Sequence, residues 1–337
     1  MHIYFVFGGM YMYDIITIGE ILAEILAEKK NQNFFELGGT LLGPFPSGAP
    51  AIAIDQAAKM GAKTTIVAKV GKDDFGLLNK NRLESSGVDI SNIIETSENT
   101  TGNAFVTYAT DGSRRFIFHF KHAACGELGP NDIDDSLIKN SKILHIMGCS
   151  VTGSPSMSAA IMKAIRTAKK HNVKISFDPN IRPELLTGET SNYFNEILES
   201  CDFLLTGKSE LVKLFGAYEK NLLELFKKKD RIIVIKDGSR GTDVYTKSEA
   251  FQVGTFPTIE VDPTGAGDCF DGTFLALYCN GIDIKTATKY GNAAGALAVS
   301  KKGPMEGNCR KEEIEHLISE NPAIEAIDIE NPFTKLL

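Results

Sequence analysis

The segment VDPTGAGDCFDGTF, residues 261–274, combines glycines, a helix start and an acid in a spacing that could do chemistry. Gly265 and Gly267 expose backbone N–H groups and allow a ligand to approach closely. The N-terminus of the expected helix adds about half a positive charge, which suits an anion such as phosphate. Asp268 places a carboxylate beside that site. A plain helix start accounts for the acid but not for two glycines around Ala266, so we interpret the segment as a phosphate cradle with a base beside it.

Other common catalytic motifs are missing from the sequence. The absence of GxxxxGK[ST], and of GxGxxG after the first strand, disfavours a P-loop enzyme and a dinucleotide-binding enzyme. The absence of HExxH and GxSxG removes the common metalloprotease and hydrolase interpretations. The six cysteines show no CxxC or Cys/His spacing, which is typical of reduced thiols in a cytosolic protein.

The length and composition are typical of a globular protein that can bury a large core. The chain has 337 residues, of which 43% are hydrophobic and 23% are charged, and it contains no tryptophan. The net charge of −7 argues against nucleic-acid or polybasic membrane partners, which require a basic surface. The opening MHIYFVFGGMYMYD has no basic start and is too short to span a bilayer, so we expect neither signal peptide nor anchor. We treat residues 1–13 as an N-terminal extension or a mis-assigned start, with Met12 as the alternative start.

The elements that must position this chemistry follow an alternating pattern. A periodic strand, DIITIGEILAEIL, begins at Asp14, and helices and strands alternate from Pro50 onward. The expected helices lie at about 51–61, 73–87 and 154–172, and the expected strands at about 64–71, 173–178, 202–206 and 231–238. This alternation predicts an α/β fold with a mostly parallel sheet covered by helices on both faces. Such sheets bind ligands at the carboxyl ends of their strands, where the glycine-rich and acidic loops fall here.

Two segments, about 31–47 and 99–124, break the alternation. The second predicts a hairpin, because AFVTYAT and RRFIFHF flank the strong turn pair Asp111-Gly112. We expect a small β-sheet lid over the active edge, with an ordinary surface meander as the alternative. No repeat or linker divides the rest, so residues 14–337 are predicted to form a single domain with this lid.

With these elements placed, DPTGAGDCF at 262–270 resembles the C-terminal signature of the ribokinase-like (PfkB) carbohydrate kinases. The resemblance runs from Asp14 to about Gly307. Its further segments are Ser47-Gly48-Ala49, VGKDDFG at 70–76, DPNIR at 178–182, TGKSE ending at Glu210, KDGSRG at 236–241 and NAAGALAVSKKG at 292–303. The resemblance implies a ribokinase-like three-layer α/β/α fold with a mostly parallel central sheet and a small β-sheet lid. It also implies ATP-dependent phosphorylation of a sugar.

The resemblance assigns roles around the cradle. The amides of Ala266 and Gly267, with Gly265, would hold the transferring phosphoryl group as an anion hole. Asp268 would accept the proton of a sugar hydroxymethyl group. Mg²⁺ would be held through waters and ATP phosphates, with Glu210 the nearest acid; the alternative for Glu210 is a solvated first-turn residue. Asp262 lies where related kinases often bind a monovalent cation such as K⁺.

The same resemblance assigns the two ligands. Asp178, Asn180 and Arg182 follow a strand and would face the substrate and the nucleotide phosphates, although a surface arginine remains the alternative for Arg182. The residues expected beside the nucleotide are Asn180, Lys236, Gly238, Gly241 and Asn292. The residues expected beside the sugar are Glu24, Gly48, Ile52, Phe118, His119 and Arg182.

The sequence also departs from the family pattern. Ile52 stands where the family has an Asn that binds sugar hydroxyls, Glu24 where it often has an Asp, and Gly207 where it has the Asn of NxxE. We therefore expect a cytosolic ATP- and Mg²⁺-dependent kinase of a monosaccharide or sugar acid, fructose-, tagatose- or 2-keto-3-deoxygluconate-like, forming a homodimer through the lid. A nucleoside or vitamin kinase of the same fold and a non-catalytic sugar-sensing protein are the alternatives.

Overall fold

The structure is a computed structural model that describes residues 12–111, 113–182 and 190–334. Ten strands form the main sheet, in the order β14-β13-β12-β11-β10-β9-β8-β1-β4-β5. Neighbouring strands are parallel throughout the part of the sheet that runs from β11 to β5. The strands β12, β13 and β14 are added antiparallel at one edge. These strands are β1 (Tyr13–Ile18), β4 (Thr64–Gly71), β5 (Ile93–Thr96), β8 (Ser141–Met147), β9 (Lys174–Asp178), β10 (Phe203–Gly207), β11 (Ile232–Lys236), β12 (Thr242–Tyr245), β13 (Ala250–Val253) and β14 (Ala326–Asp328).

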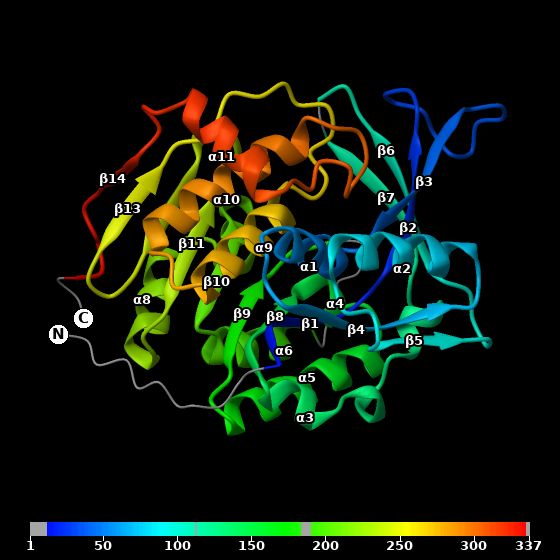
Figure 1. Cartoon of the computed structure of the whole chain (residues 1–337), viewed down its shortest axis with the longest axis horizontal. Helices are drawn as coiled ribbons and strands as arrows, with labels where there is room; N and C mark the ends of the chain where they lie inside the picture. Colours follow the sequence, from blue (N-terminus) through cyan, green and yellow to red (C-terminus); the bar gives the residue numbers. More distant parts are fainter. Residues whose placement is uncertain (1–11, 112, 183–189, 335–337) are drawn as a thin grey trace.

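Helices cover both faces of this sheet, as Figure 1 shows. They are α1 (Ala49–Lys59), α2 (Asp74–Ser86), α3 (Asp135–Lys139), α4 (Gly148–Val151), α5 (Pro155–Lys170), α6 (Thr190–Ser200), α7 (Lys208–Phe215), α8 (Glu219–Lys228), α9 (Ala266–Cys279), α10 (Ile284–Val299) and α11 (Lys311–Glu320). One apolar core lies beneath α1, α9 and α10, and the other beneath α5, α6 and α8. The central strands are apolar along their length because both of their faces are buried. This is the predicted three-layer α/β/α arrangement.

A second sheet of four strands, in the order β3-β2-β6-β7, forms the lid. Its strands are β2 (Leu22–Ala27), β3 (Leu41–Ser47), β6 (Gly102–Tyr108) and β7 (Arg114–His119). The hairpin prediction is confirmed, because β6 and β7 pair antiparallel around the Asp111 turn. The prediction of one long strand from Asp14 was wrong: the chain leaves the main sheet after Ile18 and enters the lid at Leu22, so this segment links the two sheets.

Local signals set several helix ends as the sequence predicts. Gly87 ends α2 in the left-handed conformation, with φ of 96°, which glycine adopts without a Cβ penalty. Ser154 caps α5 by accepting from the Met157 N–H at 3.1 Å. Tyr13 already belongs to β1, whereas residues 1–11 of the supposed extension lie outside the described residues.

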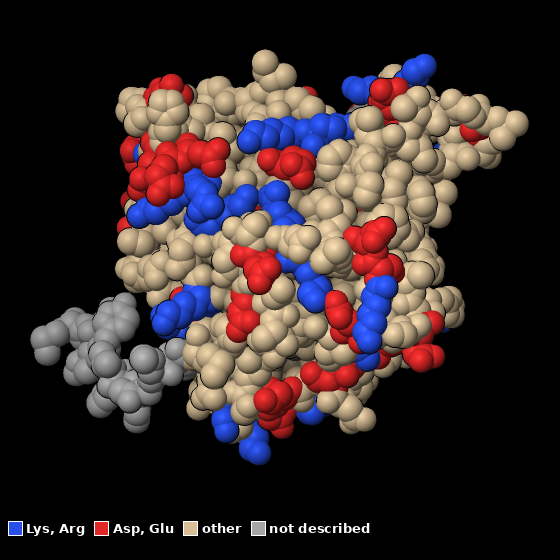
Figure 2. Space-filling view, turned by 45° about the vertical axis from the view of Figure 1, so that its right-hand side comes forward, with Lys and Arg blue, Asp and Glu red and all other residues tan. Residues whose placement is uncertain are grey.

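The surface carries charges of both signs, and Figure 2 shows them interspersed over one face of the molecule. Within the described parts of the chain, no helix is both long and apolar enough to cross a membrane.

Candidate active site

The cradle is built at the start of α9. Gly265 is the N-cap residue with φ of 83°, and a Cβ there would lie 2.4 Å from the Pro304 carbonyl oxygen, so only glycine fits. The Cys269 N–H donates to the Gly265 carbonyl at 2.8 Å. The amides of Ala266 and Gly267 precede this first turn of hydrogen bonds and, with the helix dipole, can bind an anion.

Asp268 lies in this first turn and is 5% exposed. Asn180 donates from Nδ2 to Asp268 Oδ1 at 3.0 Å, which joins the end of β9 to the start of α9. Burial raises the pKa of Asp268 to about 7, and the charge of Asp178 adds to the shift while Arg182 and Lys236 oppose it. A carboxylate whose pKa lies near neutral pH is suited to general-base catalysis.

Lys236, at the end of β11, is held between two acids. Its Nζ lies 3.0 Å from Asp178 Oδ2 and 2.8 Å from Asp271 Oδ1. Burial opposes the charge of Lys236, but the two acids outweigh it and raise the pKa above its usual range. Burial also raises the pKa of Asp271 well above its usual range, whereas for Asp178 the Lys236 charge and several hydrogen bonds together outweigh burial and lower the pKa. The sequence interpretation missed Asp271, three residues after Asp268.

Glu210 is partly enclosed at the start of α7. Its Oε1 accepts from the Ile181 N–H at 2.9 Å and its Oε2 from the Gly207 N–H at 2.9 Å. Burial and the nearby charge of Asp178 raise the pKa of Glu210. Because backbone donors already occupy both oxygens, this acid is suited to binding a metal through water.

A cavity of about 540 Å³ opens over the cradle. Its walls include the five residues predicted for the nucleotide, namely Asn180, Lys236, Gly238, Gly241 and Asn292, together with Glu210 and the cradle itself. The Asn292 side chain donates to the Val253 and Gly254 carbonyls at 2.9 and 3.0 Å and accepts from Thr242 Oγ1 at 2.6 Å. Asn292 therefore shapes this wall, while its polar atoms are already occupied.

A second, smaller cavity of about 40 Å³ lies under the lid and shares Asn180, Arg182 and Asp268 with the first. The predicted Glu24, Gly48, Ile52 and Phe118 also line it. Sequence reasoning missed its further members Glu20 and Phe116. A space of this size holds only a few waters, so a sugar needs more room than this arrangement of the lid leaves.

Two buried acceptors in this smaller cavity lack partners among the described residues: Glu24 Oε1 and Asn180 Oδ1. The other Glu24 oxygen, Oε2, accepts from Ser47 Oγ at 2.8 Å. Burial raises the pKa of Glu24 to about 7, which the Ser47 hydrogen bond partly opposes. Buried acceptors without partners are costly, so a ligand that supplies hydroxyl donors suits this cavity.

The register of β7 decides which lid side chains face the site. Phe116 and Phe118 stack on each other, with centroids 5.2 Å apart, and line the smaller cavity. His119 is exposed on the opposite side of the strand, so the structure does not bring it to the site. Arg114 shares the inner face and lines the larger cavity, which the strand alternation in RRFIFHF could have indicated.

Two arginines flank the inner face of the lid. The guanidinium carbons of Arg114 and Arg182 lie 5.7 and 6.0 Å from the centre of the Phe116 ring. Arg114 donates to Thr264 Oγ1 at 3.1 Å, and Arg182 to the Ile181 carbonyl at 3.3 Å. Within the described ranges neither forms an ion pair, so both retain charge for an anionic ligand.

Asp262 is fully buried just before the cradle. Its Oδ1 accepts from Tyr108 Oη at 2.8 Å and from the Thr264 N–H at 3.0 Å, and its Oδ2 accepts from the Gly303 N–H at 3.0 Å. The described part of the chain contains no group of three or more His, Cys, Asp or Glu residues placed to hold a metal ion. A cation at Asp262 would therefore share its carboxylate with these donors, and its binding there stays a prediction.

Comparisons with known proteins agree with this geometry. A family model described as pfkB family carbohydrate kinase matches residues 43–310. The chain is 30% identical over 321 residues to the 5-dehydro-2-deoxygluconokinase of Halalkalibacterium halodurans, covering 93% of this chain and 96% of that protein. It is 31% identical over 303 residues to Fructokinase-2 of Zea mays, covering 86% and 90%. A crystal structure from E. coli provisionally named Ribokinase II, in complex with ATP and Mg²⁺, matches with a TM-score of 0.86 and 42% identity, over 91% of this chain and 99% of that one. The chain belongs to the pfkB family of carbohydrate kinases.

Proposed function

We propose that this protein transfers the γ-phosphoryl group of ATP to a primary hydroxyl of a monosaccharide or sugar acid. Carbohydrate kinases are phosphotransferases with an alcohol as acceptor, and the chain belongs to such a family. The observation that carries the proposal is that Asp268 lines both cavities, at the point where they meet. A hydroxyl under the lid and a phosphoryl group over the cradle can therefore meet beside one carboxylate.

Different residues of this chain would supply the base, the anion-binding amides and the positive charge that phosphoryl transfer needs. Asp268 accepts the proton as the hydroxyl attacks, and its pKa near neutral pH matches that task. The amides of Ala266 and Gly267, with the α9 dipole, stabilise the charge on the moving group. Lys236, fixed by two acids, adds a positive charge at the cradle, where its Nζ lies 3.5 Å from the Gly267 carbonyl oxygen.

Mg²⁺ and ATP fit the larger cavity. When bound, Mg²⁺ would neutralise charge between the ATP phosphates. Glu210 would hold it through water, because its oxygens accept backbone N–H groups and still face the cavity. A monovalent cation such as K⁺ beside Asp262 is part of this proposal and is tested by omitting it from the assay.

The smaller cavity supports a polyhydroxylated substrate. Glu24 and Asn180 offer unpartnered acceptors, whereas Phe116, Phe118 and Ile52 provide apolar walls. Fructose, tagatose and 2-keto-3-deoxygluconate are the substrates of this kind that we consider first, and relatives are named 5-dehydro-2-deoxygluconokinase and fructokinase.

A panel assay separates the candidate functions. Release of ADP is measured with ketoses, aldoses, sugar acids, nucleosides and vitamins as acceptors. Turnover of a sugar or sugar acid supports the proposal, whereas turnover confined to a nucleoside or vitamin supports a kinase of that class. Sugar binding without any turnover would instead support the sugar-sensing alternative.

We also propose a homodimer through the outer face of the lid, with a second copy of this chain as the occupant. Large apolar side chains are exposed there, namely Phe35, Leu37, Leu41 and Ile117. Exposed apolar patches and sheet edges are commonly covered by a partner. Light scattering should give twice the mass of the chain, and Ile117→Lys should lower it; a monomer at all working concentrations would remove the dimer but not the lid.

A cytosolic location accompanies these proposals. All six cysteines are free thiols, and five of them are buried. This use of cysteine suits a reducing compartment. Fractionation of cells that express the protein tests the location.

A further inference from the structure

The two helices that carry the two halves of the site are packed directly on each other. α1 begins after Gly48 and carries Ile52 in the smaller cavity, whereas α9 begins after Gly265 and carries Asp268. A Cβ on Gly272 of α9 would lie 2.2 Å from the Ala53 carbonyl oxygen of α1, so the two backbones are in contact. The distance between the sugar and the base therefore depends on how these helices are held together.

Asn308, in the loop between α10 and α11, bonds to both helices. Its Nδ2 donates to the Ile52 carbonyl at 3.1 Å and to Asp55 Oδ2 at 2.7 Å, both on α1. Its Oδ1 accepts from the thiol of Cys269 on α9 at 2.8 Å. Cys269 follows Asp268 directly, and Ile52 lines the sugar cavity. One buried amide thus joins the neighbour of the base to a wall of the sugar cavity.

Chemistry fixes the orientation of this amide. The Ile52 carbonyl oxygen can only accept a hydrogen bond, so the NH₂ group of Asn308 must face it and the neighbouring Asp55 Oδ2. Its carbonyl oxygen is then left for the Cys269 thiol. Asp55 is fully buried and pairs with two cations: Arg82, with Nε 3.2 Å from Oδ1, and Lys59, with Nζ 3.7 Å from Oδ2.

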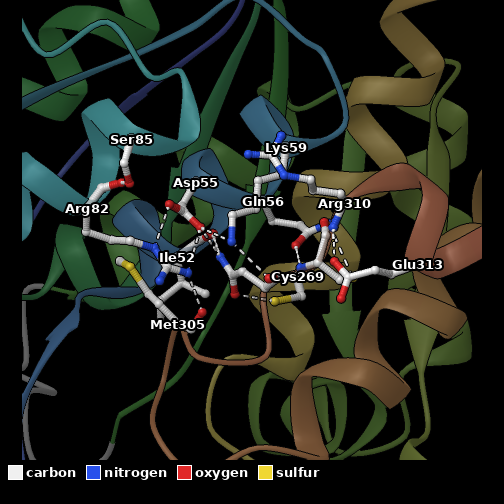
Figure 3. Close-up of polar contacts among 12 residues, drawn as sticks. Ile52, Asp55, Gln56, Lys59, Arg82, Ser85, Cys269, Met305, Arg310 and Glu313 are labelled. Atoms are coloured by element: carbon white, nitrogen blue, oxygen red, sulfur yellow. Dashed lines mark hydrogen bonds and ion pairs between the residues drawn. The ribbon is translucent and has the colours of Figure 1, made fainter.

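The polar contacts around Asp55 form one network, drawn in Figure 3, that reaches Cys269 in the first turn of α9. Arg82 of α2 also donates to the Met305 carbonyl at 2.6 Å, and Lys59 to the Asn308 carbonyl at 2.9 Å. These bonds hold the loop in which the Pro304 carbonyl packs against Gly265. The same loop is therefore attached to α1, to α2 and to the first residue of the cradle.

We propose that Asn308 is a positioning residue for phosphoryl transfer, which sets the place of Asp268 and the cradle relative to the sugar wall of α1. The inference rests on the proposed kinase function. Asn308 touches no substrate; it acts through Ile52 and Cys269. Because a displacement of about 1 Å can slow a reaction roughly 10²-fold, loss of this link should lower the rate without preventing ATP binding.

The first test is Asn308→Leu, which keeps the approximate shape and removes all side-chain hydrogen bonds. We expect kcat to fall about 10- to 100-fold and the KM for the sugar to rise, while the KM for ATP stays within about twofold. The pH at which the rate is half-maximal should not move, because the contacts of Asp268 itself are intact.

The matched control is Arg231→Met. Arg231 is also buried, and it donates to the Leu198 carbonyl at 2.5 Å and to the Cys201 sulfur at 3.5 Å, far from the site. The Arg231→Met substitution should lower Tm and leave kcat unchanged.

A milder pair covers the case in which Asn308→Leu does not fold. Cys269→Ala removes only the donor to Asn308 Oδ1, whereas Cys269→Ser keeps an O–H donor there. We expect a several-fold loss of kcat in the Ala variant and recovery in the Ser variant. Equal rates for Ala and Ser, or a normal kcat in Asn308→Leu with a lowered Tm, would overturn the positioning role.

Hydrogen exchange of the backbone amides at residues 48–53 and 265–269 gives a readout that needs no turnover. These two segments should exchange faster in Asn308→Leu than in Arg231→Met; equal exchange overturns the inference. If wild-type protein phosphorylates no acceptor, the proposed kinase function fails, and the exchange result still decides whether Asn308 holds the two helix starts together.

Discussion

Tyr108, at the end of lid strand β6, donates a hydrogen bond to Asp262, 154 residues later in the chain and directly before the cradle. The distance is 2.8 Å, both side chains are buried, and the Lys302 ammonium lies 4.2 Å from the centre of the Tyr108 ring. Burial and the charge of Asp262 raise the pKa of Tyr108 far above its usual range, so its proton stays available for this bond. This hydrogen bond therefore links the lid to the segment that precedes the cradle.

Tyr108→Phe should weaken lid closure. A hydrogen bond to a charged group contributes about 1.5–3 kcal/mol, so we expect kcat/KM for the sugar to fall on the order of tenfold, with ATP affinity unchanged. The matched control is Tyr13→Phe, which removes a Tyr–Asp bond to Asp89 from a similarly buried tyrosine outside the site. Equal effects of the two variants on kcat/KM would show that the lid contact has no special role.

Asp268→Asn keeps the shape of the side chain and removes the base. We expect kcat to fall about 10²- to 10⁴-fold, because general bases contribute factors of that size. ATP affinity, measured by titration calorimetry, should change little, since the cradle amides remain. Asp74→Asn, which alters a first-turn acid of α2, is the control and should keep its kcat. A near-normal kcat for Asp268→Asn would rule out the base assignment.

The rate should depend on pH through Asp268. Its pKa is raised to about 7, so below that pH the carboxyl is protonated and cannot accept the substrate proton. We expect kcat/KM to fall roughly tenfold per unit as the pH drops below 7 and to level off above it. Because the pKa of Glu24 is also raised to about 7, the pH profile is measured again in Glu24→Gln. In this variant kcat/KM should still fall about tenfold per pH unit below pH 7, through Asp268 alone. A flat profile between pH 5.5 and 8 would contradict the assignment.

Stability should depend on pH in the opposite direction. The raised pKa means that the folded state binds the Asp268 proton more tightly than the unfolded state does. The resulting stabilisation is fully present below the unfolded pKa of about 4 and is lost as the pH rises through about 7. Asp268→Asn cannot ionise, so its Tm without ligands should exceed that of wild type by an amount that grows from pH 5 to about pH 7 and is constant above that pH. Thermal melts across this range test the sign, and a constant Tm difference would show that Asp268 does not titrate there.

Ile52→Asn tests the departure from the family pattern. Ile52 is 2% exposed, yet it lines the smaller cavity and packs beside Gly265. We expect a lower Tm, because an amide is buried there, and a shift of kcat/KM toward sugars that carry a hydroxyl at that point. Ile54→Asn, at a buried position of α1 outside the cavity, should lower Tm without shifting the ratio between paired sugars. An unchanged ratio in Ile52→Asn would make Ile52 a core residue only.

The sequence by itself determined the local chemistry of this protein. The positive φ of Gly265 and the first-turn place of Asp268 follow from residue types at fixed spacing, so the cradle could be recognised without a structure. The parallel sheet followed from periodicity, because buried strands and amphipathic helices leave different apolar patterns. The order of motifs along the chain indicated the family, which the comparisons show.

Only the tertiary structure decided which distant residues meet. Asn180 and Asp268 are 88 residues apart and bond because β9 ends beside the start of α9. Side chains alternate between the two faces of strand β7, so that Arg114 points inward and His119 outward. The spacing in the sequence alone does not say which of the two faces is buried. Asn308 gives no signal in the sequence, since its contacts with Ile52 and Cys269 arise where two helices and a loop pack together. Packing over long sequence separations, rather than local propensity, completes the site.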